Sequence, residues 1–403
     1  MEIIVRQKYL SHIISHLNKG MMIILVGQRR VGKSFMLRQL KQWLEENKPQ
    51  SNVVYVNKEL LDFRDIENAV DLHNYVVPKF PESGDNYLLI DEVQDIAGYE
   101  DALRSLHAED RCQIVATGSN AYIFSSELST RIGGRYIEIP IYSLTYREFL
   151  QFHELPDTDG SLNDYLRVGG LPGLRLYDIS DEIPVRDYIQ GVYNTIMMRD
   201  IVARKQIRNV PFLENLSRFI ADNNGKLIST SSIVKFMKSQ GESISETMTA
   251  SYIRYLCKAL VIDPVARYDL HGKKLFELIF KYYFADHGIR NFLCGFRLRD
   301  SIEKVMENVV YHHLLTQGFK VNVGILRAGE IDFVATRGRQ TIYVQVTYLL
   351  ASDDTIAREF GNLAAINDNY PKYVVSMDPV SGEFTAYPGI SHVHIREFLK
   401  TEL

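Results

Sequence analysis

The stretch LVGQRRVGKSFMLRQL (residues 25–40) decides how the first third of the chain folds. It continues the short apolar run MMIILV (21–26), which is typical of a strand buried in a parallel sheet, and it ends in a helical pattern. Between them lies the motif G-x-x-x-x-G-K-S, which begins at Gly27 and ends at Ser34. A strand before this motif and a helix after it form the context in which such a loop surrounds a phosphate. The stretch therefore predicts a nucleotide-binding loop in an α/β domain.

The loop residues have distinct expected roles toward ATP and Mg²⁺. Glycines let backbone N–H groups approach a phosphate, and the start of the following helix adds the positive end of its dipole. Lys33 is expected to reach the β- and γ-phosphates, and the Ser34 hydroxyl is expected to bind Mg²⁺. The residues expected to hold the nucleotide are Gly27, Gln28, Arg29, Arg30, Val31, Gly32, Lys33, Ser34 and Phe35.

A second apolar strand delivers two carboxylates. In YLLIDEVQ (87–94) an apolar run ends in Asp91 and Glu92. At the end of a strand in such a sheet, Asp91 would lie beside the phosphate loop and hold Mg²⁺, and Glu92 would polarise the attacking water. An Asp-Glu pair in this place also serves in helix-capping turns. A phosphate loop earlier in the chain favours the catalytic interpretation.

Two further segments offer polar groups next to strands. TGSN (117–120) ends the next apolar strand, so Asn120, or Ser119 before it, is expected to bond the γ-phosphate or the attacking water. Capping the following helix is the alternative role for both residues. Arg131 and Arg135 precede the last strand of the domain, and either would stabilise transition-state charge within its own chain or in a neighbouring subunit of an oligomer. The alternative is an exposed arginine at the start of a strand.

The alternation of elements divides the chain into three regions. Up to residue 145, strands alternate with helices, which predicts one domain with a parallel sheet covered on both faces. From about 143 to 285 the pattern is mostly helical, and from about 286 strands return. The last region is therefore expected to be a separate α/β unit.

The helical middle contains a pattern typical of DNA-binding units. Residues 223–269 have the pattern of three short helices followed by a strand, which fits a helix-turn-helix with a wing. Between 201 and 300, 16 Lys and Arg stand against 9 Asp and Glu, a basic balance that suits a polyanion partner and equally a solvated basic surface. The alternative is a lid extension that transmits the nucleotide state through protein contacts. The side chains expected to face a phosphate backbone are Ser245, Thr247, Thr249, Ser251, Arg254, Lys273 and Lys274.

The stretch EIDFVATRGRQTIYVQVTY (330–348) has the order of a metal-dependent nuclease core. Such a core takes a carboxylate from a helix, an aspartate from one strand and Glu-x-Lys from the next. Glu307 and Asp332 fill the first two places, but Gln345 and Thr347 stand where the second carboxylate and the lysine are needed. Glutamine is a weaker ligand for a hard cation, and threonine carries no charge near neutral pH. We therefore expect a nuclease-like frame without cleavage.

Composition and the start of the chain favour a cytoplasmic protein. The 403 residues carry a net charge of −4, and the three cysteines, Cys112, Cys257 and Cys294, lie far apart. This sparse, odd number argues against a disulfide framework or a zinc site. The first residues lack the layout of a signal peptide, and the run 21–26 is far shorter than the ~20 residues of a membrane span. We therefore expect no membrane association.

The chain resembles the bacterial and archaeal AAA-type ATPases of the additional-strand, catalytic-glutamate class, on the motifs GQRRVGKS, LLIDE, TGSN, GGR and LTYREFL. YLRVGGLPGL resembles their lid segment. A domain of unknown function accompanies this ATPase. Four later stretches of the chain resemble that domain: KYYFADHGIRNFL, ENVVYHHLL, EIDFVA and VQVTYLL. The resemblance implies nucleotide binding by the phosphate loop, Mg²⁺ binding by Asp91 and water activation by Glu92. It passes sensor and arginine-finger roles to Asn120, Arg131 and Arg135.

The resemblance also implies an order of domains within the α/β class. It predicts a P-loop NTPase parallel sheet over residues 1–145 and a helical lid over 146–205. A winged-helix-like domain is expected over 206–285, and a restriction-endonuclease-like α/β domain over 286–403.

Together these features predict an ATP-binding and ATP-hydrolysing, Mg²⁺-dependent switch or motor with a nucleic-acid-related role. Its expected partners are ATP, DNA through residues 223–274, and a protein through the C-terminal domain. One alternative is a signalling ATPase that acts on protein partners. Another is an ATP-gated nuclease, which Gln345 and Thr347 disfavour.

Overall fold

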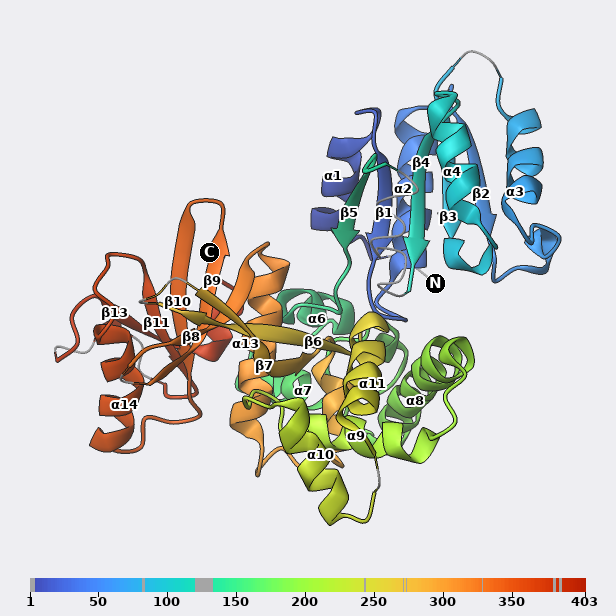
Figure 1. Cartoon of the computed structure of the whole chain (residues 1–403). Helices are drawn as coiled ribbons and strands as arrows, with labels where there is room; N and C mark the ends of the chain where they lie inside the picture. Colours follow the sequence, from blue (N-terminus) through green and yellow to red (C-terminus); the bar gives the residue numbers. More distant parts are fainter. Residues whose placement is uncertain are drawn as a thin grey trace. The chain divides into compact units, whose positions relative to one another are not determined.

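The chain forms two compact units, Met1–Tyr142 with Lys258–Leu260, and Ser143–Cys257 with Val261–Leu403. The first unit contains the phosphate-loop motif, and the second contains nearly all of the chain that follows it (Figure 1). The computed structural model describes residues 4–81, 84–119, 133–242, 244–270, 272, 274–327, 329–379, 382–383 and 386–403.

The first unit is built on a five-stranded sheet with the strand order β2-β3-β4-β1-β5, in which all neighbours are parallel. Strand β4 lies between β1 and β3, which carry the phosphate loop and the Asp-Glu pair at their ends. This arrangement confirms the α/β class and the P-loop type of sheet. The strands are β1 (Met22–Val26), β2 (Asn52–Asn57), β3 (Asn86–Asp91), β4 (Gln113–Gly118) and β5 (Tyr136–Pro140).

Helices cover both faces of this sheet, as the apolar run of β1 requires (Figure 1). Met22 and Ile24 join the core beneath α3 and α4, whereas Ile23 and Leu25 join the core beneath α1 and α2. Strand β1 is therefore buried along its whole length, which fixes the position of the loop that follows it. The helices are α1 (Gln7–His16), α2 (Lys33–Asn47), α3 (Ala69–Val76) and α4 (Tyr99–Ala108), with short 3-10 helices η1 (Leu61–Phe63), η2 (Val77–Lys79) and η3 (Val93–Asp95).

The second unit begins with the helices that were expected to form a lid, and they are joined to later parts of the chain. The Asn291 amide donates to the carbonyls of Leu166 and Arg167 at 2.8 and 2.9 Å, and a 2.7 Å hydrogen bond joins His287 to the Tyr165 carbonyl. None of the helices in the described ranges is long and apolar enough to cross a membrane. The helices are α6 (Tyr146–His153), α7 (Asp159–Val168), η5 (Pro172–Leu176), α8 (Glu182–Thr195), the π-helix η6 (Ile196–Ala203), α9 (Val210–Asp222), α10 (Thr230–Ser239), α11 (Glu246–Lys258), α12 (His287–Leu293), α13 (Ile302–Thr316), α14 (Asp353–Ala364) and α15 (Ile395–Phe398).

An eight-stranded mixed sheet forms the rest of the second unit, with the order β12-β13-β11-β10-β9-β8-β6-β7. The strand that was expected to be a wing, β6, pairs with β8 as well as with β7. The sheet therefore continues across the domain boundary that was expected at 285/286. Pairing with β8 satisfies backbone groups that a free two-stranded wing would leave at its edge. The strands are β6 (Ile262–Asp269), β7 (Lys274–Phe284), β8 (Lys320–Ile325), β9 (Glu330–Arg337), β10 (Gln340–Val346), β11 (Lys372–Ser376), β12 (Gly382–Glu383) and β13 (Ile390–His394).

Candidate functional site

The phosphate loop joins the end of β1 to the start of α2, as the sequence predicts. Two of its residues adopt left-handed backbone conformations, Arg30 with φ 70° and Gly32 with φ 101°. Such a conformation suits glycine and strains arginine, because Gly32 lacks the Cβ that clashes there. A strained residue held by its surroundings is typical of functional loops.

Glycine at position 27 is required by packing inside the unit. A Cβ at Gly27 would lie 2.1 Å from the carbonyl oxygen of Ile141, which is backbone and has little freedom to move. Residue Ile141 follows β5, which pairs with β1. The sequence therefore predicts the right residue type at position 27, but the contact that requires it comes from the neighbouring strand.

Lys33 is buried and turned back onto its own loop. Its Nζ donates to the carbonyls of Gly27 at 2.9 Å and Gln28 at 3.0 Å. Both polar atoms of the Gln28 side-chain amide are buried without a hydrogen-bond partner in the described part of the chain. Buried polar groups are almost always paired, so this orphaned amide fits a loop that receives a polar ligand. The loop thus offers a cation and an unused amide at the same place.

Asp91 is fully buried and held by hydroxyl groups. Its Oδ1 accepts from Thr117 Oγ1 at 2.7 Å and from Ser34 Oγ at 3.1 Å, and its Oδ2 accepts from the Tyr55 hydroxyl at 3.4 Å. Burial raises the pKa of Asp91 above its ordinary value, although the Thr117 and Ser34 hydrogen bonds oppose this shift. The Ser34 hydroxyl and the Asp91 carboxylate are the hard oxygen ligands that Mg²⁺ prefers. The two predicted metal ligands therefore lie together.

Glu92 is buried among polar side chains and feels the charge of Lys33. Its carboxylate accepts from Ser119 Oγ at 2.5 and 2.8 Å, and it also accepts from the Gln94 amide. Burial would raise the pKa of Glu92, but the charge of Lys33 and these hydrogen bonds outweigh burial and lower it. The side chain is therefore ionised at neutral pH, as a base must be. Its backbone φ of 56° is unusual for a glutamate and marks a strained strand end.

The site therefore brings together Lys33, Ser34, Asp91 and Glu92, as the sequence predicts, and adds two supporting residues. Thr117 was not foreseen, although it stands at the polar end of an apolar strand, where a side chain faces the adjacent strand's carboxylate. It also accepts from the Glu92 N–H at 2.9 Å. Tyr55, on β2, was equally missed, because nothing in its own strand indicates a role.

The remaining predicted site residues lie elsewhere or outside the described part of the chain. Arg135 is exposed and immediately precedes β5, and its carbonyl accepts from the N–H of Met22 at the start of β1. The phosphate loop follows the other end of β1, roughly 13 Å further along the strand. Arg135 is thus not brought to the site of its own unit. Asn120 and Arg131 lie outside the described residues.

A second cluster of charged side chains, here called the Lys281 cluster, consists of Lys281, Glu307, Glu330 and Asp332. The buried Lys281 Nζ lies 3.0 Å from Glu307 Oε1, 2.7 Å from Glu330 Oε1 and 3.0 Å from Asp332 Oδ1. Glu307 comes from α13, the two other carboxylates from β9, and the lysine from β7. The expected helix and strand carboxylates do meet, around a lysine from a strand that was read as part of the helical middle.

A bulge in β9 lies beside this cluster. Ile331 pairs with Gly324 and Val334 with Asn322, so three steps on β9 match two on β8. The extra residue re-aims the strand, a device often found beside functional sites. The Asp332 carboxylate also accepts from the Val346 N–H at 2.9 Å.

The other two predicted positions in this frame have structural partners. Gln345 accepts from the Asp332 N–H at 3.2 Å, and Thr347 donates to Glu303 at 3.5 Å. Neither side chain supplies the charge that the nuclease pattern needs at its place. Among the described residues, no group of three or more His, Cys, Asp and Glu side chains is arranged to hold a metal ion.

The charges of the Lys281 cluster partly balance one another. Burial would lower the pKa of Lys281, but the carboxylates around it, Glu307 first, raise it well above its usual range. Burial raises the pKa of Glu307 well above its ordinary value, whereas Lys281 and the hydrogen bonds to Asp332 outweigh burial and lower the pKa of Asp332. The ammonium therefore neutralises carboxylates that would otherwise be buried without a cation. The sequence signal was Lys281 as the single charged residue in the run LIFKYYF (278–284), because a buried charge needs a partner.

The expected DNA-facing side chains of the middle region fall into two groups. On α11, Thr247 and Arg254 are exposed and Ser251 is half-buried. Thr249 is fully buried and donates to the Ser245 carbonyl at 3.0 Å, so its expected contact with a phosphate is wrong. Helical spacing places it on the inner face of α11 beside apolar residues. Lys273 lies outside the described residues, and the structure describes no side-chain position for Lys274.

Two family models match this chain. An AAA domain matches residues 19–150, and a domain of unknown function, DUF8612, matches residues 159–300. The first match spans the phosphate loop, Asp91 and Glu92. The second crosses the expected boundaries at 205 and 285.

Relatives of similar length are known. An uncharacterized protein of Haemophilus influenzae is 30% identical over 400 residues, which cover 98% of this chain and 98% of that protein. The uncharacterized protein MJ1544 of Methanocaldococcus jannaschii is 27% identical over 347 residues, 81% of this chain and 74% of the relative. Among solved structures, the Orc1 protein of Aeropyrum pernix in complex with DNA aligns with a TM-score of 0.32 at 16% identity, over 73% of this chain and 94% of that chain. So weak a structural likeness carries no inference.

Proposed function

The chain belongs to the same family as the Haemophilus influenzae relative and contains an AAA domain, and from this we propose that it is an ATP-hydrolysing, Mg²⁺-dependent switch or motor. The observation that carries the proposal is the joint placement of Lys33, Ser34, Asp91 and Glu92 at one end of a parallel sheet. Phosphate, metal and water each have a chemically suitable partner there.

The division of labour between the two carboxylates follows from their surroundings. Asp91 accepts from three hydroxyls and lies next to Ser34, so it suits a ligand of Mg²⁺, directly or through water. Bound Mg²⁺ would neutralise charge on the phosphates. Glu92 keeps a lowered pKa and is oriented by Ser119, so it suits the base that polarises the attacking water.

The proposed arginine finger acts between subunits if Arg135 supplies it. Arg135 lies at the far end of β1 from the phosphate loop of its own unit, where it is exposed to solvent. An exposed arginine on one subunit can reach a nucleotide held by a neighbour. This role requires an oligomer, so turnover per subunit should rise with protein concentration in the unaltered protein, and this rise should be lost in an Arg135→Ala variant.

Replacing Lys33 by alanine is expected to weaken ATP binding by about 100-fold or more, because the loop loses its buried cation. Isothermal titration with ATP and Mg²⁺ measures the change. The matched control is Lys41→Ala on the same helix, where the lysine side chain is 39% exposed and pairs with Glu45. Equal affinities for Lys33→Ala and the unaltered protein would contradict the nucleotide site.

The nucleic-acid role is supported by the basic middle region and by one helix face. Between residues 201 and 300 the chain carries 16 Lys and Arg against 9 Asp and Glu. Helix α11 presents Thr247 and Arg254 to solvent while Tyr252 and Leu256 bind it to the core. Since β6 is paired within the large sheet, we propose that α11, rather than a free wing, contacts the DNA backbone.

If α11 binds DNA, duplex DNA should stimulate ATP turnover, and Arg254→Ala should weaken DNA binding by about ten-fold at low salt. Fluorescence anisotropy with a labelled duplex measures binding at about 50 and about 200 mM salt, between which the affinity should fall steeply. Arg339→Ala, an exposed arginine in the turn between β9 and β10, is the control. The signalling alternative would be favoured if DNA did not change ATP turnover and if DNA binding were absent or independent of salt.

A further inference from the structure

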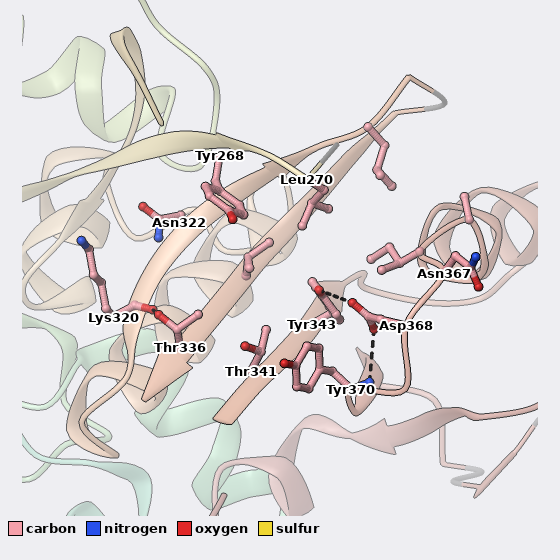
Figure 2. Close-up of a pocket in the computed structure, with 14 residues that line it drawn as sticks. Tyr268, Leu270, Lys320, Asn322, Thr336, Thr341, Tyr343, Asn367, Asp368 and Tyr370 are labelled. Atoms are coloured by element: carbon pink, nitrogen blue, oxygen red, sulfur yellow. Dashed lines mark hydrogen bonds between the residues drawn. The ribbon is translucent and has the colours of Figure 1, made fainter. Parts of the chain in front are cut away.

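A cavity of about 660 Å³ lies in the second unit, away from the Lys281 cluster. Its walls come from β6, β8, β9 and β10 and from the segment 365–370, which joins α14 to β11 (Figure 2). Cavities of this size with mixed polar and apolar walls commonly receive small molecules or single residues of a polymer. No function proposed above uses it.

Three tyrosine rings line the cavity. Tyr268 comes from β6, Tyr343 from β10, and Tyr370 from the segment after α14, and Figure 2 shows all three around the same space. The ring centroids of Tyr343 and Tyr370 lie 6.5 Å apart at 58°. Tyr370 is 45% exposed, so its ring is available at the mouth of the cavity. Tyr343 is only 4% exposed, so Tyr370 offers the ring on which a flat, aromatic ligand would stack.

The cavity offers the side-chain amide of Asn322 to a ligand. Asn322, on β8, is only 9% exposed and lines the cavity, yet no hydrogen bond joins its side-chain amide to another residue in the described part of the chain. This amide offers one donor and one acceptor side by side, which match the donor and acceptor groups on the edge of a nucleobase.

The charges at the cavity favour an anionic group at one end. Lys320, at the start of β8, is exposed and forms no ion pair among the described residues. The carboxylate of Asp368 is already engaged: it accepts from the Tyr343 hydroxyl at 2.6 Å, the Tyr370 N–H at 3.2 Å and Lys372 Nζ at 3.3 Å. An incoming phosphate would therefore be attracted by Lys320 more strongly than it is repelled by Asp368, whose charge is already engaged.

From these observations we propose that the cavity binds one nucleotide unit, separate from the phosphate-loop site. Its base would lie among Tyr268, Tyr343 and Tyr370, with the base edge on Asn322 and the phosphate near Lys320. The same chemistry is presented by a free nucleoside monophosphate and by a residue of a single-stranded nucleic acid. The site does not depend on ATP binding or on α11.

Binding is tested on the full chain carrying Lys33→Ala, which removes the competing nucleotide site. The probes are thymidine monophosphate, followed by isothermal titration, and fluorescein-labelled tetrathymidylate, followed by anisotropy. Both carry the same base, so the comparison isolates the strand. Comparable binding of both assigns the site to a free nucleotide, and binding of the tetranucleotide alone assigns it to a single strand.

Tyr370→Ala and Lys320→Ala should each lower the affinity for the probe by about ten-fold. The first variant loses stacking, and the second loses a phosphate contact. The matched controls are Tyr348→Ala, which removes a tyrosine that is 42% exposed outside the cavity, and Lys19→Ala, which removes an exposed lysine of the first unit. They should leave affinity unchanged. Absence of binding by both probes would overturn the proposal, and so would equal losses in the variants and their controls. If Tyr370→Ala and Lys320→Ala unfold at the same temperature as the parent protein, misfolding is excluded as the cause of their weaker binding.

Discussion

Replacing Glu92 by glutamine is expected to lower ATP turnover about 100- to 10,000-fold while ATP still binds. The carboxylate is buried, and Lys33 and the hydrogen bonds from Ser119 and Gln94 keep it ionised. Glutamine has nearly the same shape but cannot accept a proton from water. Steady-state phosphate release measures the loss, and isothermal titration on the same sample measures retained binding.

The control for this variant is Glu59→Gln. Glu59 is an exposed carboxylate after β2, and its charge also acts on Asp91, so it reports on a general loss of negative charge near the site. We expect its turnover to stay within about two-fold of the unaltered protein, as for an exposed charge screened by solvent. Undiminished turnover in Glu92→Gln would remove Glu92 as the base. Parallel losses of binding and turnover would assign it a structural role.

Replacing Lys281 by methionine is expected to destabilise the second unit by about 3–5 kcal/mol, because buried carboxylates lose their cation. The first unit should be unaffected. The single tryptophan of the chain, Trp43, lies on α2 in the first unit, so its fluorescence reports that unit alone. Circular dichroism in urea should therefore show one transition moved to lower denaturant, while the Trp43 transition stays in place.

Two further measurements separate lost charge from lost packing. Without Lys281, burial raises the pKa of the remaining carboxyls above their unfolded values, so the variant should be more stable at pH 5 than at pH 8. Adding Asp332→Asn to Lys281→Met should restore part of the stability, since one uncompensated charge disappears. Lys238→Met, an exposed lysine on α10, is the control. A pH-independent loss without rescue would show that Lys281 acts only by filling space.

The placement of Lys281 also sharpens the question of cleavage in the tail. Thr347 stands where the nuclease pattern requires lysine, and the lysine that reaches the carboxylates comes instead from β7. Its ammonium lies within 3.0 Å of three carboxylates, where a nuclease would place a cation. The expectation of a frame without cleavage thus gains a physical reason, and it stays a prediction.

The sequence by itself determined the local elements of this protein and the reactive groups at their ends. An apolar run, a glycine motif and a helical pattern predict the β1–loop–α2 unit, because strand burial, phosphate-loop geometry and helical spacing are properties of contiguous residues. The same reasoning predicts Asp91 and Glu92 at the end of β3. Contiguous residues also indicated most strands of the second sheet.

Only the tertiary structure decided which distant residues meet. The partners of Asp91 and Glu92 on neighbouring strands, Thr117 among them, follow from strand order, which no single strand encodes. The β6–β7 hairpin joins the large sheet because β8 offers unpaired backbone groups, and this pairing brings Lys281 to Asp332 across 51 residues. Parallel pairing also puts Arg135 and the phosphate loop at opposite ends of β1. Charge balance and backbone pairing are satisfied between elements, so they become visible only when the elements are packed.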